Sequence, residues 1–279
     1  MHFSKFLLLQ LQAALASAET ARTPCPTGIP IRVPALIDPA LNTTNTSSPT
    51  HTTSTYIAPP LGFLTGIWYL TNSTLDSYKE RGDLQWDCAP TFPNCLANNT
   101  ADCFPGSLPG AWTDLNTWTL ASPKDEPFRF DAIAPGNRSV ASVLVYTVPR
   151  RVNFPDLGPD WDGVYDAVAN PKGPLGSYQQ SYTINSWGHD SKGVPFLTLF
   201  EQRGITHKNE SRYPAALSVF SRVRTGVAAP TLSKVLRAMV DFGNPELTKM
   251  VNNMGPSKWN YNLPEGPVIC GEKCMNNIK

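Results

Sequence analysis

The sequence has little net charge and no long apolar run, and both absences exclude classes of function. Lys and Arg together number 23 and Asp and Glu 22, which gives a net charge of +1. These charges are scattered along the chain, whereas nucleic-acid binding needs a clustered basic patch. No segment after the N-terminus reaches the roughly 20 apolar residues of a membrane-spanning helix. We therefore expect neither nucleic acid nor a membrane span among its functions.

Histidine is also scarce, which argues against familiar hydrolytic chemistry. His2 and His51 lie in N-terminal segments, and His189 and His207 fall in an expected turn and loop. A Ser/His/Asp or Cys/His nucleophile needs its histidine within hydrogen-bond reach. The glycines do not follow the spacing of a phosphate-binding loop. The sequence predicts no hydrolase triad, and we expect no cofactor.

Residues 1–18 have the pattern of a secretory signal peptide. Lys5 precedes a short apolar run at 6–9, and Ala16-Ser17-Ala18 is a small-x-small cleavage site. The run is too short for a membrane anchor. We expect cleavage after Ala18 and a secreted, extracellular protein.

Secretion gives meaning to the glycosylation sequons and the cysteines. The six sequons, which we expect at the surface, are at Asn42, Asn45, Asn72, Asn98, Asn137 and Asn209. The six cysteines are Cys25, Cys88, Cys95, Cys103, Cys270 and Cys274. An even number in an oxidising compartment predicts up to three disulfides, but the sequence does not choose among the pairings. No histidine lies near these cysteines, so the sequence favours disulfides over a metal site.

Composition divides the mature chain into three parts. Residues 19–60 are rich in Pro, Thr and Ser and predict an extended, glycosylated leader. Residues 61–255 form the folded body, and residues 256–279 a Cys-containing tail. Two long loops are expected within the body, at 89–110 and 149–176, and each reads equally well as a lid or as a surface insertion.

The sequence pattern of the folded body, residues 61–255, is typical of an all-β domain. Eight runs with β-branched or aromatic enrichment and turn residues at their borders are expected strands: 67–71, 84–88, 112–121, 128–133, 140–148, 178–187, 195–202 and 216–223. In two of these runs a polar-aromatic face alternates with the other face, as at Trp112, Asp114, Asn116 and Trp118. Such a face suits a lined cavity better than a dry core.

Two amphipathic helices are expected near the C-terminus. Pro230 opens the first, whose apolar residues recur with helical spacing until Gly243. Asn244-Pro245 opens the second, which ends before Gly255-Pro256. We expect both to pack against the sheet.

The two ends of this pattern resemble the lipocalins, the secreted branch of the calycin superfamily. Gly66-Ile67-Trp68 resembles the Gly-x-Trp of that family's first strand, and the segment 216–222 before a helix resembles its last strand with its arginine. The family's Thr-Asp-Tyr-like triplet is absent, and the corresponding turn is 187–193, so the resemblance is to a distant member. That member would be of the fungal, secreted type. The resemblance covers about residues 62–255.

The resemblance implies a single closed eight-stranded antiparallel barrel with C-terminal helices packed outside. Such a barrel has no unpaired edge and leaves room for one small ligand. Gly66, Trp68 and Arg222 would form a structural cation–π lock at its floor. The expected ligand-lining residues are Trp112, Trp118, Phe196, Phe200, Phe220 and Tyr182.

Carboxylates and tyrosines are the candidates for chemistry. Those on or beside the expected strands are Asp83, Asp87, Asp114, Glu201, Tyr178 and Tyr182. A carboxylate inside a cavity has a raised pKa suited to proton transfer. We take Glu201, Asp114 and Tyr182 as the candidate catalytic residues. An ordinary solvated or paired role is the alternative for each of them.

Three functions remain open. The first is a carrier that binds a small lipophilic metabolite, and the second is an enzyme of the cyclase or isomerase type acting on a polyketide or terpenoid. Such an enzyme needs mainly a preorganised shape and one or two polar groups, so its sequence need not contain a recognisable catalytic motif. The third is a secreted interaction protein. The ligand and the oligomeric state are not given by the sequence.

Overall fold

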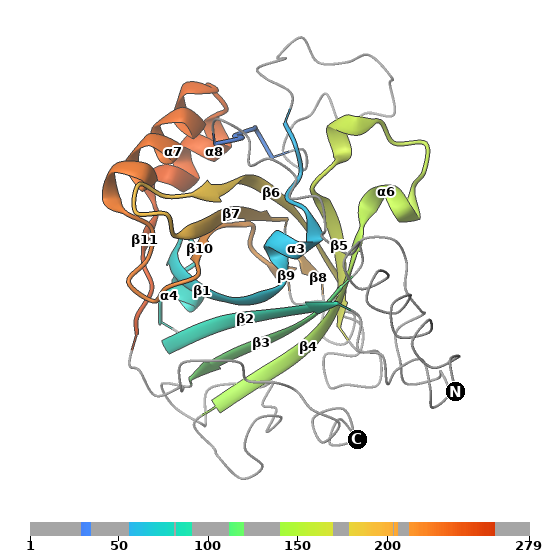
Figure 1. Cartoon of the computed structure of the whole chain (residues 1–279), viewed down its shortest axis with the longest axis horizontal. Helices are drawn as coiled ribbons and strands as arrows, with labels where there is room; N and C mark the ends of the chain where they lie inside the picture. Colours follow the sequence, from blue (N-terminus) through green and yellow to red (C-terminus); the bar gives the residue numbers. More distant parts are fainter. Residues whose placement is uncertain are drawn as a thin grey trace, which may run out of the picture.

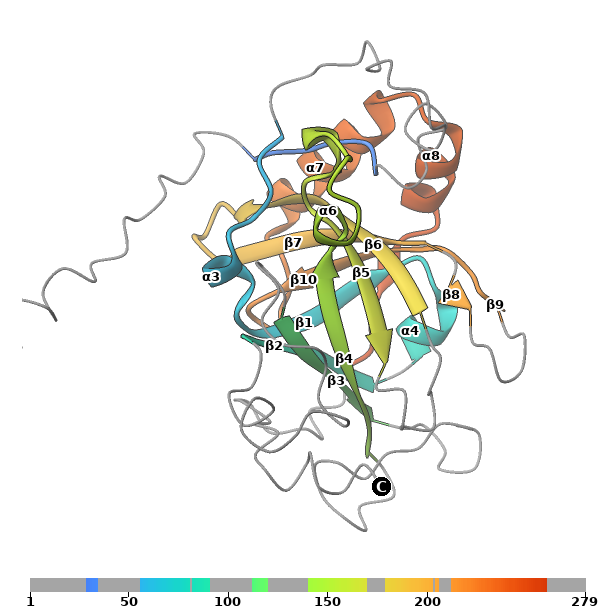
Figure 2. The same cartoon turned by 90° about the vertical axis from the view of Figure 1, so that its right-hand side faces the viewer.

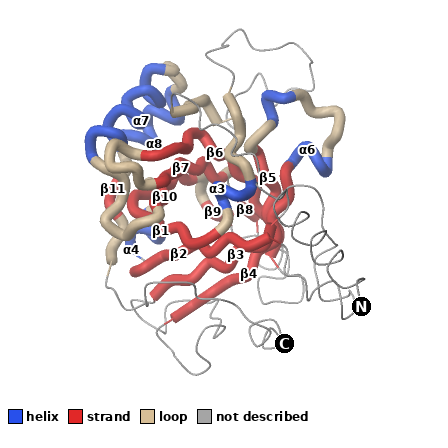
Figure 3. The backbone as a smooth tube through the Cα atoms, viewed as in Figure 1, coloured by secondary structure: helices blue, strands red, loops and turns tan. Residues whose placement is uncertain are grey.

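The computed structural model describes residues 29–34, 56–80, 82–90, 112–119, 140–169, 179–202, 204–205 and 212–259. This part of the chain is mostly β, with a few helices (Figure 3). Its signature is one antiparallel sheet that curls strongly (Figure 1). The predicted strand at 128–133, like the signal peptide at 1–18, lies outside the described residues.

Eight long strands make up the curled sheet. They are β1 (Gly66–Ser73), β2 (Gly82–Pro90), β3 (Trp112–Thr119), β4 (Val140–Pro149), β5 (Val164–Ala169), β6 (Gln179–His189), β7 (Pro195–Glu201) and β10 (Ala216–Ser221). Their order is β5-β4-β3-β2-β1-β10-β7-β6, and β5 pairs in addition with β6 over five residue pairs. Short strands β8 (Gly204–Ile205), β9 (Arg212–Tyr213) and β11 (Gly255–Pro256) extend the sheet.

Strand β5 corrects the prediction of a continuous loop over 149–176. This segment also holds the short helix α6 (Arg150–Asn153) and the 3-10 turn η1 (Pro159–Trp161). The surrounding Pro, Gly and Asp residues concealed the strand in the sequence. Pairing with both β4 and β6 stabilises it as a strand.

Two buried clusters lie on opposite faces of the sheet. The inner cluster contains Leu64, Trp68, Leu70, Leu84, Trp86, Cys88, Val145, Tyr165, Ala167, Tyr182, Ile184, Trp187, Leu197, Leu199 and Phe220. The outer cluster contains Trp161, Val164, Phe196, Phe200, Leu217, Val219, Val227, Val235, Met239 and Leu247. Because successive residues of a strand point to opposite faces, each strand supplies side chains to both.

Helices α7 (Ala229–Asp241) and α8 (Pro245–Asn252) cover the outer cluster (Figures 1 and 2). Val235, Met239 and Leu247 are the helix residues that are fully buried there. Asn244 caps α8, because its side chain accepts a hydrogen bond of 3.0 Å from the N–H of Leu247. Both predicted helices are confirmed, with ends within a few residues of those expected.

Asp190 joins the β6–β7 hairpin to the start of α7. Its carboxylate accepts hydrogen bonds from the N–H groups of Lys192 at 2.8 Å, Val194 at 2.9 Å and Ala228 at 2.8 Å. Burial by itself would raise the pKa of Asp190, but the three backbone donors outweigh it and hold the pKa below its ordinary value. The hydroxyl of Thr231 in α7 accepts a further bond from the N–H of Ser191.

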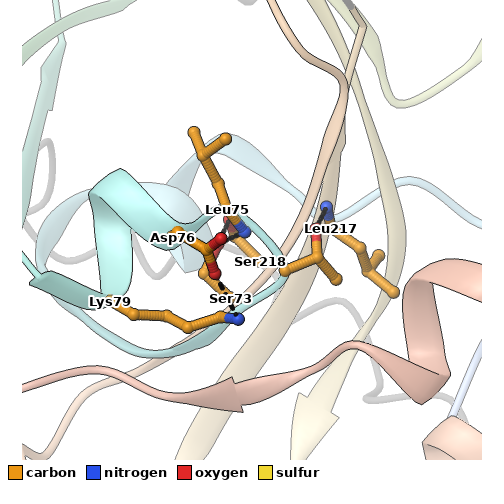
Figure 4. A network of polar contacts seen from close by, with 7 residues as sticks. Ser73, Leu75, Asp76, Lys79, Leu217 and Ser218 are labelled. Carbon is orange, nitrogen blue, oxygen red and sulfur yellow. Dashed lines mark hydrogen bonds and ion pairs between the residues drawn. The ribbon is translucent and has the colours of Figure 1, made fainter.

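A small polar network fixes the opposite end of β1 to β10 (Figure 4). The hydroxyls of Ser73 and Ser218 lie 3.3 Å apart, and Ser73 also accepts from the N–H of Leu75. Next to it begins the short helix α4 (Asp76–Glu80), in which Lys79 pairs with Asp76 at 2.9 Å. The chain is thereby held where it leaves β1 for β2.

Candidate functional site

One end of the curled sheet is closed by helix α3 (Leu61–Leu64) and by Arg222. The guanidinium carbon of Arg222 lies 3.9 Å from the ring centroid of Trp68. The same guanidinium donates to the carbonyls of Ile67 at 2.8 Å, Phe63 at 2.7 Å and Thr65 at 2.6 Å. Trp68 in turn donates from Nε1 to the carbonyl of Leu64 at 2.8 Å. The arginine therefore joins the ends of two distant strands to the closing helix.

Two pieces of the leader contribute to the same closure. The side chain of Arg32 lies 4.1 Å from the ring centroid of Tyr56, and it donates to the carbonyl of Asp160 at 2.9 Å. The hydroxyl of Tyr56 donates to the carbonyl of Ile184 at 2.7 Å. Burial lowers the pKa of Arg32 and raises the pKa of Tyr56 and of Tyr165. Parts of the predicted leader thus pack on the fold rather than lying apart from it.

Four aromatic rings of the inner cluster contact one another in a row, although β2, which carries Trp86, is adjacent to neither β6 nor β10 in the sheet. The ring centroids of Tyr165 and Tyr182 are 5.4 Å apart, those of Tyr182 and Trp86 are 6.1 Å apart, and those of Trp86 and Phe220 are 5.4 Å apart. All four side chains are buried. Ring separations of this size are typical of favourable aromatic contacts. The expected lining residues Tyr182 and Phe220 both belong to this row.

Glu201 lies beside the aromatic row, at the end of β7. Its register partners are Tyr182 on β6 and Ala216 on β10. Gln180 donates from Nε2 to Oε2 of Glu201 at 3.2 Å. Glu201 is only 7% exposed, so it is largely shielded from bulk water. Two of the three candidate catalytic residues, Glu201 and Tyr182, are therefore directly opposite each other.

The third candidate, Asp114, shares the inner face by its register. It is paired with Cys88 on β2 and with Val145 on β4, and both of these belong to the inner cluster. Trp112 and Trp118 occupy positions of the same parity on β3. The backbone places these three residues, so their part in lining an interior stays a prediction.

Phe196 and Phe200 do not lie with the other expected lining residues. Both belong to the outer cluster beneath α7 and α8, whereas their neighbours Leu197 and Leu199 belong to the inner cluster. The strict alternation of β7 makes this separation necessary, since Glu201 shares the parity of the two leucines. The prediction that these two phenylalanines line the same space as Tyr182 is wrong.

Sequence reasoning missed Tyr165, because the whole of β5 had been taken as a loop. It also gave no role to Trp86 or Trp187, although each is buried in the inner cluster. The available signal for Tyr165 was a short alternating run, Val164 to Ala169, directly after Gly163. Its length was too small to stand out among the Pro, Gly and Asp residues around it.

Most modification sites fall outside the described residues. This holds for Asn42, Asn45, Asn98, Asn137 and Asn209, and for Cys25, Cys95, Cys103, Cys270 and Cys274. The side chain of Asn72 is half-buried, and Cys88 is buried in the inner cluster. Glycosylation and disulfide formation both stay predictions.

The described residues lack two kinds of feature. No helix within them is long and apolar enough to cross a membrane. The same residues hold no group of three or more His, Cys, Asp or Glu side chains that could bind a metal ion. What they offer is a buried carboxylate, an amide and a row of aromatic rings.

Comparison with known proteins gives a structural neighbour but no family. No family model matches the chain, and no curated protein matches its sequence. A solved structure of apocrustacyanin C1 is similar over 72% of this chain and 81% of its own, with 11% sequence identity and a TM-score of 0.39.

Proposed function

We propose that this chain is a secreted, lipocalin-like protein whose eight long strands form a closed barrel that binds a small lipophilic metabolite. The support for closure is the cyclic order of pairing, in which each of the eight strands has two long neighbours and β5 meets β6. Closure removes the sheet edges that would otherwise invite aggregation. The helix α3 and the Arg222–Trp68 contact close one end of this barrel.

The observation that carries the binding proposal is the character of the inner face. Rings from four different strands follow one another there, and Glu201 and Gln180 lie beside them. A face of apolar and aromatic side chains with a few polar groups is typical of small-molecule sites. The carboxylate of Glu201 and the amide of Gln180 supply those polar groups here.

Native mass spectrometry of the protein, purified from the medium into which its source cells secrete it, tests the proposal. We expect the mass of the intact protein to exceed that of the delipidated protein by the mass of one small molecule. After extraction, this molecule should bind to the delipidated protein again. A protein that is purified without any bound small molecule, and that binds none of a panel of lipophilic probes, would contradict the proposed function.

The alternative is an enzyme of the cyclase or isomerase type that acts on a polyketide or terpenoid. It is favoured by one observation, the direct opposition of Glu201 and Tyr182 on the inner face. A carboxylate and a phenol so placed suit proton removal at one atom of a bound substrate and donation at another. Turnover separates the two functions: an enzyme converts the co-purified molecule or its precursor, whereas a carrier returns it unchanged.

Secretion, glycosylation and disulfide bonding are parts of the same proposal. Each has a direct measurement on the protein from its source. The mature N-terminus should be Glu19, enzymatic deglycosylation should reduce the mass, and alkylation should find few free thiols.

A further inference from the structure

We infer that the interior admits only a compact ligand, because the rings of Trp86 and Tyr182 meet across it and block the part next to helix α3. This inference rests on the proposed binding function and names the size class of the ligand. The ligand would be a ring-shaped or short-chain lipophilic molecule rather than a long-chain lipid.

Trp86 and Tyr182 come from strands on opposite sides of the curled sheet. Strands β1, β10 and β7 separate β2 from β6 along one path, and β3, β4 and β5 separate them along the other. Figure 1 shows β2 and β6 facing each other across the interior. The two ring centroids are nevertheless only 6.1 Å apart, with an angle of 82° between the ring planes. The two side chains therefore meet in an edge-to-face contact across the full width of the interior.

Two more rings extend this contact into a layer. An eight-stranded barrel is just wide enough either to be filled by its own side chains or to hold one small ligand. The ring centroid of Phe220 lies 5.4 Å from that of Trp86, and that of Tyr165 lies 5.4 Å from that of Tyr182. All four side chains are buried. At the level of these four residues, which we call the aromatic layer, side chains therefore fill the interior.

The interior is also packed between the aromatic layer and the end closed by α3. Trp68, the register partner of Trp86, is fully buried and lies against Arg222. The ring centroid of Phe63 in α3 lies 5.5 Å from that of Trp68 and 4.8 Å from that of Trp187. A ligand that enters from the other end of the barrel therefore stops at the aromatic layer.

The distance from the aromatic layer to the far end of β1 sets the depth that is left for a ligand. Five residue steps separate Trp68 from Ser73, the last residue of β1. They correspond to about 17 Å along the strand, and to about 13 Å along the axis of a barrel whose strands are tilted by about 40°. An extended alkyl chain with C–C bonds of about 1.5 Å advances about 1.3 Å per carbon, so this depth takes a chain of about ten carbons. The hydrogen-bonded pair of Gln180 and Glu201 lies toward the same end, beside Tyr182.

Calorimetric titration of the intact protein with a series of unbranched primary alcohols tests the inference. The probes are hexanol, octanol, decanol, dodecanol and tetradecanol, each used below its solubility limit. We expect the affinity to rise about fourfold with each added carbon up to decanol, because each added methylene is buried. From decanol to tetradecanol we expect a change of less than about twofold, because the further methylenes stay in water.

The variant Trp86→Ala removes one ring of the aromatic layer. We expect it to shift the limit to a longer alcohol, so that tetradecanol binds about tenfold more tightly than decanol. Trp161→Ala is the matched control, because it removes the same kind of side chain from the outer cluster, and it should leave the limit at decanol. If Trp86→Ala does not fold, the series of alcohols on the wild-type protein still decides.

The outcomes distinguish the two proposals. An affinity that keeps rising from decanol to tetradecanol in the wild type would refute the aromatic layer as a barrier while leaving a binding protein. A limit that stays at decanol in Trp86→Ala would do the same. No binding of any alcohol would also refute the inference, and together with no co-purifying molecule it would refute the binding function itself.

Discussion

At the scale of single residues, two side chains hold distant parts of the chain together through backbone groups. Asp190 accepts from three N–H groups, and Arg222 donates to three carbonyls. Charged groups in such positions satisfy backbone atoms that have no strand or helix partner. Their loss should therefore be measurable as stability rather than as activity.

Asp190→Ala should lower the free energy of unfolding by about 1–3 kcal/mol at neutral pH, because buried N–H groups lose their acceptor. Since the pKa of Asp190 is lowered in the fold, its contribution is full above the unfolded pKa and is lost as pH falls through the folded pKa. The difference in the free energy of unfolding between wild type and variant should therefore become smaller at acidic pH. Urea unfolding at several pH values measures this. Asp156→Ala, at an exposed residue, is the control, and a gap that is constant with pH would contradict the account.

Arg222→Lys tests the closure beneath Trp68. Lysine keeps the charge but cannot donate to three carbonyls while lying flat on a ring. We expect a loss of about 1–2 kcal/mol in the free energy of unfolding, together with a change in the near-ultraviolet circular dichroism of tryptophan. Arg237→Lys, at an exposed residue of α7, is the matched control and should show neither effect. Equal stability of the two variants would mean that the guanidinium contributes nothing beyond its charge.

At the scale of elements, the strand boundaries were largely readable from the sequence. Seven predicted strands end within two residues of those observed, because β-branched and aromatic runs are bounded there by turn residues. β5 was not readable, since its six residues depend on β4 and β6 for their conformation. Long-range pairing of this kind leaves little local trace.

The inner face was only partly readable for a related reason. Alternation assigns Tyr182 and Ile184 to one face, but the register shifts between Ile184 and Ser186. After this irregularity Trp187 joins the inner cluster, which simple alternation would have excluded. The sequence showed that Leu197, Leu199 and Glu201 share a face. Which face that was depended on where α7 and α8 pack.

The start of β1 makes a further prediction. Gly66 has a φ of +107°, and a Cβ atom there would lie 2.8 Å from Nη1 of Arg222. Gly193 also has a positive φ, of +79°, but open space around it. Gly193→Ala should therefore cost only its backbone strain, about 1 kcal/mol, while Gly66→Ala should cost about 2–3 kcal/mol. Thermal unfolding of the two variants compares them, and equal losses would show that Arg222 moves aside freely.

At the scale of the whole molecule, the curled sheet separates two tasks between its faces. The outer face is covered by α7 and α8 with aliphatic and phenylalanine side chains. The inner face carries Trp68, Trp86, Trp187, Tyr165, Tyr182 and Glu201. Under the proposed function, stability and binding depend on different side chains of the same strands. Substitutions at Phe200 and at Glu201 should consequently have different effects, although the residues are neighbours in sequence.

Closure of the barrel depends on the meeting of β5 and β6, and hydrogen exchange can test it. In an antiparallel strand, alternate amides point to each neighbour. If the pairing of β5 with β6 persists in solution, the amides of β5 that point toward β6 should exchange as slowly as those that point toward β4. The ladder between β1 and β10, at the centre of the strand order, is the internal reference. Fast exchange confined to the β5–β6 side would show an open sheet with two free edges, and an open sheet would not enclose a ligand.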